Sequence, residues 1–197
     1  GGKMGKLKEV EFTRLDQAKK SDFDIVHPLM LEQHQGLADR IIDHLKLLSG
    51  PKLGFKVDRL EHSLQTATRA YRDGANEELV VCALLHDMGD LLAPDFHGAF
   101  ASEILRPFVS DVNYNIVRYH QEFQGYFFFD KIGFDPNIRE RHRKEEWFDA
   151  AHNFCEAWDM PSFDPDYKSE KIDFFEPIVK NLFAKAGTHN GVEINNN

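Results

Sequence analysis

LLHDMGD, residues 84–90, is the stretch that decides the fold of this chain, because an apolar run ends there in a His-Asp pair and a glycine. The seven residues 79–85 that lead into the pair, LVVCALL, have the character of a buried helix. Buried without partners, His86 and Asp87 would each cost several kcal/mol or titrate to neutrality. The pair therefore requires a compensating partner, and the identity of that partner bears on the function.

Apolar residues recur at helical spacing along almost the whole chain, and the alternation typical of strands is scarce. Short connections between these segments predict a compact all-α bundle with one interior. We expect a flexible N-terminal arm over residues 1–20, the helical domain over residues 21–187 and a disordered tail over residues 188–197. The expected helices cover residues 29–48, 58–74, 76–88, 97–107, 111–121, 145–159 and 173–185, and a Phe-rich loop or short helix follows residue 121.

The composition argues against several classes of partner. The chain has 197 residues and a formal charge of −9, which disfavours a nucleic-acid backbone or an anionic membrane as the main partner. No apolar run reaches the roughly 18 residues that crossing a bilayer requires, and the first residues lack the hydrophobic core of a signal peptide. We therefore expect a cytoplasmic protein in which Cys82 and Cys155 are structural thiols. The sequence carries no signal for the oligomeric state.

Helical phase directs two histidines and two aspartates toward apolar faces, namely His97, His120, Asp87 and Asp159. A lone histidine on such a face is more often a hydrogen-bonded core residue than a ligand. Several on separate helices that share one interior indicate a metal centre instead. His62 fits less well, because it points nearly opposite to the apolar stripe of its helix. It reaches the interior only if that helix is covered on both sides.

A plainer interpretation suits the remaining histidines, aromatics and cations. His27, His34 and His44 are expected at the surface or as capping residues, whereas His152 shares the stripe of the last aspartate and is a candidate partner for a ligand. The FFF run at 127–129 is expected in the core. A basic cluster is most simply a solvated face, with anion binding as the alternative; it consists of Arg139, Arg141, Arg143 and Lys144.

Taken in order along the chain, these residues resemble the H…HD…D pattern of the HD-domain superfamily, an all-α fold whose members bind one or two divalent metals. The matching residues are His62, the doublet His86-Asp87 and Asp159, with His97 and His120 between them as in the dinuclear subset.

The surrounding sequence is similar to one branch of this superfamily. LEHSLQTA at 60–67, HQEFQGYFFF at 120–129 and AWDMPSFDPDY at 157–167 resemble small HD-domain oxygenases with a mixed-valence diiron centre. These enzymes oxidise 1-hydroxyalkylphosphonates and cleave the C–P bond; the version acting on the trimethylammonium-bearing substrate is nearest, and myo-inositol oxygenase is a more distant relative. The resemblance spans about residues 25–185.

The resemblance implies a role for each of the six residues. One metal is held by His62, His86 and Asp159, the other by His97 and His120, and Asp87 bridges the two. It also implies two Fe ions in the Fe(II)/Fe(III) state, with O2 and a small-molecule substrate as partners. No catalytic side chain beyond the metal ligands is then needed, because the metals supply the chemistry and the protein supplies the positioning.

The substrate-binding positions depart from the related enzymes. Gln124 stands where the aminoethyl-type phosphonate enzyme carries a lysine that holds the phosphonate, and Lys52 and Phe55 stand where that enzyme carries a tyrosine and a glutamate. Phe55 in place of the glutamate either suits a quaternary ammonium group through its aromatic face or indicates another substrate altogether. We expect the substrate to meet Gln124, and its anion to meet Arg139 and Arg143 in place of the missing lysine.

Two alternatives to the oxygenase stay open at this point. Most members of the superfamily are phosphohydrolases, in which the same ligands hold Mn, Co or Zn and activate water on a phosphate ester or nucleotide. Ligand identity does not separate the two activities, because histidine and carboxylate suit all of these metals. The other alternative is a metal-free scaffold or binding module.

Overall fold

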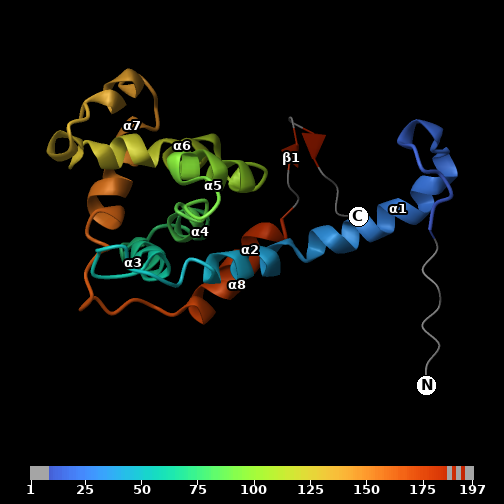
Figure 1. Cartoon of the computed structure of the whole chain (residues 1–197), viewed down its shortest axis with the longest axis horizontal. Helices are drawn as coiled ribbons and strands as arrows, with labels where there is room; N and C mark the ends of the chain where they lie inside the picture. Colours follow the sequence, from blue (N-terminus) through green and yellow to red (C-terminus); the bar gives the residue numbers. More distant parts are fainter. Residues whose placement is uncertain (1–8, 186–187, 190–191, 194–197) are drawn as a thin grey trace.

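The computed structural model describes residues 9–185, 188–189 and 192–193. Within these residues the fold is all-α, as predicted, apart from one short antiparallel pair of strands, and Figure 1 shows the arrangement. None of the described helices is both long and apolar enough to cross a membrane. The helices are α1 (Phe23–Gln35), α2 (Leu37–Lys46), α3 (Arg59–Arg72), α4 (Glu77–Leu85), α5 (His97–Leu105), α6 (Asp111–Gly125), α7 (Phe148–Phe154) and α8 (Ile172–Phe183); the strands are β1 (Thr188–His189) and β2 (Val192–Glu193).

The expected domain boundaries stay a prediction. Residues 1–8 of the N-terminal arm lie outside the described residues, and the described remainder includes a 3-10 turn at Leu15–Gln17. Most of the expected tail also lies outside them, while its described residues form the β1–β2 pair.

Side-chain caps explain why three helices begin where the sequence predicts. Asp58, Asn76 and Ser110 each precede a helix, and each side chain accepts a hydrogen bond from the backbone N–H three residues later. Such a cap satisfies one of the backbone donors that a helix start leaves free, for about 1 kcal/mol. These caps fix the first residues of α3, α4 and α6, which carry or precede the predicted ligands.

The prediction of one continuous helix over residues 29–48 is wrong, because the structure has two helices there. The chain is helical from Phe23, but the helix breaks at Gly36, where glycine is the poorest helix former after proline. Helix α2 buries Ile41, Ile42 and Leu45, whereas α1 buries no residue and extends away from the other helices (Figure 1). Only the second half of the expected helix therefore belongs to the core.

The helix expected over residues 145–159 starts later and changes form. Helix α7 begins at Phe148 and gives way after Phe154 to one π-helical turn, Cys155–Asp159, in which Met160 N–H donates to the Cys155 carbonyl at 2.8 Å. Such widened turns within α-helices are frequently found at functional sites. This turn ends on a fully buried aspartate. Helix α6, in contrast, runs four residues past its expected end.

Helix α3 is covered on both sides, which meets the condition set for His62. Helix α4 packs along one side, and the π-turn with the loop that follows it covers the other. The buried residues of α3 therefore occupy most of its circumference: His62, Ser63, Leu64, Gln65, Thr66, Ala67, Thr68 and Ala70.

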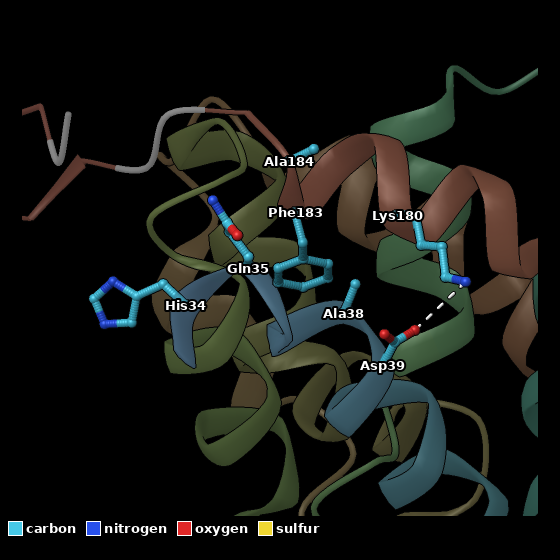
Figure 2. A pocket seen from close by; sticks show the side chains of 7 residues that line it. All are labelled: His34, Gln35, Ala38, Asp39, Lys180, Phe183 and Ala184. Carbon is cyan, nitrogen blue, oxygen red and sulfur yellow. Dashed lines mark ion pairs between the residues drawn. The ribbon is translucent and has the colours of Figure 1, made fainter. Parts of the chain in front are cut away.

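Helix α8 closes the opposite side of the domain against α2 and α4. Phe183 lies beside Ala38 of α2 and is buried, while Lys180 and Asp39 form an ion pair of 3.4 Å between the two helices (Figure 2). Both charged side chains are half exposed or more, so this pair contributes less than about 1 kcal/mol. Apolar burial holds α8 in place, and the hollow drawn in Figure 2 contains none of the predicted metal ligands.

Candidate metal centre

The structure brings all six predicted ligands together in the interior. They come from α3, the turn after α4, the start of α5, the middle of α6 and the π-turn. Five of them are at most 3% exposed, and the side chain of His97 is 13% exposed. The six are His62, His86, Asp87, His97, His120 and Asp159.

His62, His86 and Asp159 form the first group of donor atoms. His62 Nε2 lies 3.2 Å from His86 Nε2 and 3.2 Å from Asp159 Oδ1, and His86 Nε2 lies 3.7 Å from the same oxygen. Around an ion with bonds of about 2.0–2.2 Å, neighbouring ligand atoms lie about 3.0–3.6 Å apart. The spacing of this group therefore fits one metal ion.

His97, His120 and Asp87 form the second group. Asp87 Oδ1 lies 3.0 Å from His97 Nε2 and 3.2 Å from His120 Nε2, and the two ring nitrogens are 3.1 Å apart. The other oxygen, Asp87 Oδ2, lies 3.4 Å from His62 Nε2 in the first group. Asp87 Oδ1 also lies 3.5 Å from His86 Nε2, so the carboxylate of Asp87 lies between the two groups.

The hydrogen bonds of the four Nδ1 atoms show that the four Nε2 atoms, which face the centre of the group, are acceptors. Each of the four Nδ1 atoms lies within 3.0 Å of a backbone carbonyl, which can only accept, so each Nδ1 carries the proton. In the neutral rings, four Nε2 lone pairs and two carboxylates then converge with no proton between them, and a proton or a metal cation at their centre would compensate them. The pairs are His62–Ser162, His86–Ala83, His97–Pro94 and His120–Val117.

The electrostatics of the group favour a cation at its centre. Burial disfavours the charged form of His86, but Asp87 and Asp159 outweigh it and raise the pKa of His86 to about 9. Burial likewise opposes ionisation of both aspartates, but the surrounding imidazoles hold their pKa values below the usual range. Burial, with the neighbouring imidazoles, lowers the pKa of His120. Without metal, a proton on His86 supplies part of the positive charge.

Metal affinity is therefore expected to rise with pH. A metal ion must displace the proton of His86, whose pKa of about 9 keeps it protonated at neutral pH, while the carboxylates stay ionised. The apparent dissociation constant for Mn²⁺ should fall about tenfold per pH unit between about pH 6 and 8, with release of about one proton. Calorimetry in two buffers of different ionisation enthalpy measures both, and an affinity independent of pH would contradict this account.

Glycine at 98 brings α5 and α6 close enough to position His120. A Cβ at Gly98 would lie 2.9 Å from the Val117 carbonyl oxygen, which accepts from His120 Nδ1, and 3.1 Å from that ring nitrogen. Gly98→Ala is expected to lower the free energy of unfolding by about 1–3 kcal/mol and to weaken the second metal site. Urea unfolding and metal analysis test this, with Gly50→Ala as the matched control because its Cβ meets nothing within 4 Å. Equal losses in both variants would contradict it.

Two polar side chains hold the aspartates from outside. Gln124 Nε2 lies 3.1 and 3.2 Å from the two oxygens of Asp159. Arg59 Nε donates to Asp90 Oδ2 at 3.1 Å, and its Nη1 lies 3.7 Å from Asp87 Oδ2. Sequence reasoning missed Arg59, although its position three residues before His62 puts both on one helix face.

A cavity of about 500 Å³ opens beside these two side chains. Phe163 stacks on His62 with ring centroids 4.3 Å apart, and Phe55 stacks on Phe163 at 5.3 Å. The cavity therefore borders three side chains that contact candidate ligands, namely Arg59, Gln124 and Phe163, and its other walls carry further aromatic rings. Its lining consists of Phe55, Arg59, Gln124, Phe128, Ile132, Met160 and Phe163. Phe128 corrects the expectation that the FFF run belongs to the core.

Arg139 and Arg143 do not line this cavity, which corrects their expected role. Arg139 is 5% exposed, with Nη1 2.7 Å from His152 Nδ1 and its guanidinium 3.4 Å from the Tyr126 ring centroid. Arg143 pairs with Glu140 at 2.6 Å on the surface. The local hydrogen bonds of these side chains, which helical phase does not report, hold both in place. His152 consequently contacts Arg139 rather than a metal ligand.

His44 is also placed differently from the expectation. It is half-buried, its Nε2 lies 2.8 Å from the Met88 carbonyl oxygen, and its ring stacks on Phe100. The side chain therefore braces the turn that carries the His-Asp pair. His27 and His34 are exposed, as expected.

Comparison with known proteins agrees with this geometry. The chain is similar to the [1-hydroxy-2-(trimethylamino)ethyl]phosphonate dioxygenase (glycine-betaine-forming) of Leisingera caerulea, with 38% identity over 79 residues. That match covers 34% of this chain and 40% of the relative's length. Residues 59–153 match the family described as HD domain, a range that includes five of the six clustered residues and ends six residues before Asp159. Over residues 59–153 the chain is therefore similar to the HD domain family.

Proposed function

We propose that this chain is a diiron oxygenase that uses O2 to cleave the C–P bond of a 1-hydroxyalkylphosphonate. The observation that carries the proposal is the position of Asp87, whose carboxylate oxygens lie 3.0–3.5 Å from the Nε2 atoms of all four histidines. The similarity to a relative named as a phosphonate dioxygenase supports the choice of chemistry.

Each metal has its own set of ligands in this proposal. The first group, with Asp159, would hold one iron, the second group the other, and Asp87 would join them. When bound, the two irons supply Lewis acidity toward the substrate hydroxyl and the electrons for O2 activation. The protein positions both reactants and fixes the ring orientation of every histidine through its Nδ1 hydrogen bond.

The cavity supplies substrate positioning. Phe55, Phe128 and Phe163 offer aromatic faces, and none of the described residues that line the cavity is acidic. A primary ammonium group would have no carboxylate partner there, whereas a trimethylammonium group is stabilised by ring faces through cation–π attraction. We therefore propose a quaternary ammonium substituent, or an apolar one of similar size, on the substrate. Gln124 holds Asp159 in this arrangement rather than replacing the missing lysine.

The second candidate is a dinuclear phosphohydrolase. It is favoured by the ligand set itself, since four imidazoles and two carboxylates suit Mn, Co or Zn as well as iron. In that case the metals would activate water and no O2 would be consumed.

Iron-loaded protein separates the two activities. We expect an S = 1/2 mixed-valence signal in electron paramagnetic resonance. With 1-hydroxy-2-(trimethylamino)ethylphosphonate we expect one phosphate and one carboxylic acid for each O2 consumed, because the two oxygen atoms of O2 are then fully accounted for in the products. Elemental analysis should give two irons per chain. Turnover of a generic phosphate ester without O2 uptake, together with the absence of the mixed-valence signal, would support the hydrolase and reject the oxygenase.

A further inference from the structure

We infer that Arg59 is the anion-binding residue of the cavity and holds the phosphonate group of the substrate. The inference rests on the proposed function for the identity of the anion, but Arg59 would bind a phosphate ester in the same way. Arg59 is the one charged residue among the described residues that line the cavity. It begins helix α3, three residues before His62.

The guanidinium of Arg59 donates one hydrogen bond through Nε, and its two terminal nitrogens form none with the described residues. Asp90 accepts from Nε at 3.1 Å, and among the described residues no other hydrogen bond from Arg59 is formed. Nη1 lies 3.7 Å from Asp87 Oδ2, which is too long for a hydrogen bond. The terminal nitrogens therefore keep donors for a ligand, and a planar guanidinium matches a phosphonate with two parallel hydrogen bonds.

The surroundings of Arg59 orient a substrate in one direction. Its guanidinium carbon lies 5.3 Å from the Phe55 ring centroid, and its side chain is 26% exposed. Phe128, Ile132 and Phe163 form an apolar wall of the same cavity. An anion at Arg59 lies next to Asp87, hence next to the metals, while the remainder of the substrate meets the apolar wall. With both metals bound, their charge exceeds that of the carboxylates, so an anion is attracted to this end.

The other side chains considered for anion binding are already engaged in other contacts. Gln124 carries no charge, and its amide group donates to Asp159. Arg139 contacts His152, and Arg143 pairs with Glu140 away from the cavity lining. The positive charge that Gln124 does not supply would therefore come from Arg59 of α3, which lines the same cavity.

Anion binding can be measured without turnover. The full chain is loaded with Mn²⁺, its metal content is counted, and methylphosphonate is titrated by calorimetry. We expect Arg59→Gln to keep two metals and to raise the dissociation constant of methylphosphonate about tenfold or more. Arg59→Lys keeps the positive charge but cannot donate two parallel hydrogen bonds from one planar group, so it should give an intermediate dissociation constant. Arg72→Gln on the same helix is the matched control, since Arg72 pairs with Glu170 on the surface.

A second probe and the metal count decide the remaining outcomes. Tetramethylammonium, which lacks an anion, should bind Arg59→Gln within about twofold of the unmodified chain. Binding of methylphosphonate to Arg59→Gln within about twofold of the unmodified chain would overturn the inference, as would an equal loss in Arg72→Gln. If neither Arg59 variant retains two metals, Arg59 positions Asp87 instead and the inference is wrong. If only the proposed oxygenase activity is wrong, the chain consumes no O2 with the hydroxyphosphonate, but methylphosphonate binding still depends on Arg59.

Discussion

Asp87→Asn is expected to lower the metal content from two ions per chain to one or none and to reduce turnover at least about a hundredfold. Even partners outside the ligand set typically cost about 10- to 100-fold in metal affinity or activity, and Asp87 contacts both groups directly. The amide keeps the shape of the side chain but removes its charge and one of its two acceptor oxygens. Each of the two proposed metals would then lose a ligand atom or a neighbouring negative charge.

The measurements are elemental analysis and O2 uptake with the hydroxyphosphonate. Asp95→Asn is the matched control, because Asp95 is exposed on the segment just before α5 and contacts none of the six ligands. Circular dichroism establishes that both variants keep their helices. An Asp87→Asn protein with two metals and full turnover would show that this carboxylate does not join two ions, and the dinuclear assignment would be wrong.

Chelation of the metals is expected to lower the melting temperature by about 8–16 °C. A ligand that binds only the folded chain at about a thousand times its dissociation constant stabilises it by about 4 kcal/mol. For a chain of this length, each kcal/mol moves the melting temperature by about 2–4 °C. The physical source is the buried group of lone pairs and carboxylates, which repel one another once the cations are removed.

Differential scanning calorimetry with and without EDTA at one pH measures this effect, and added Mn²⁺ should restore the transition. His86→Ala lacks a ligand of the first group and should respond less to the chelator than the unmodified chain does. A melting temperature unchanged by chelation in the unmodified chain would mean that the six residues are satisfied without metal.

Much of the fold was readable from local rules. The caps at Asp58, Asn76 and Ser110 mark helix starts, because a short polar side chain before an apolar run satisfies a free backbone donor. The all-α class follows because apolar residues recur at helical spacing along almost the whole chain. The break at Gly36 was missed because apolar residues continue on both sides of it, and only α2 has a core to pack against.

The position of His62 shows where periodicity stops being informative. Phase identifies the more apolar face of a helix, but a helix packed on two sides also buries its other face. The second covering comes from residues about 100 positions later, where the Ser162 carbonyl accepts from His62 Nδ1 at 3.0 Å. A contact of that sequence separation leaves no local signal.

Sequence alone determined the helical class and the approximate limits of most helices, because these depend on local spacing and residue type. The set of six candidate ligands came from the resemblance to HD-domain proteins, since helical phase by itself left His62 outside the interior. Tertiary structure decided which side chains surround these ligands. It placed Arg59 and Gln124 beside the aspartates, Phe128 in the cavity wall, and Arg139 and Arg143 elsewhere. The stretch at 84–90 supplies two of the six residues, but the other four arrive from separate helices. Their meeting depends on packing between distant segments, which no single stretch encodes.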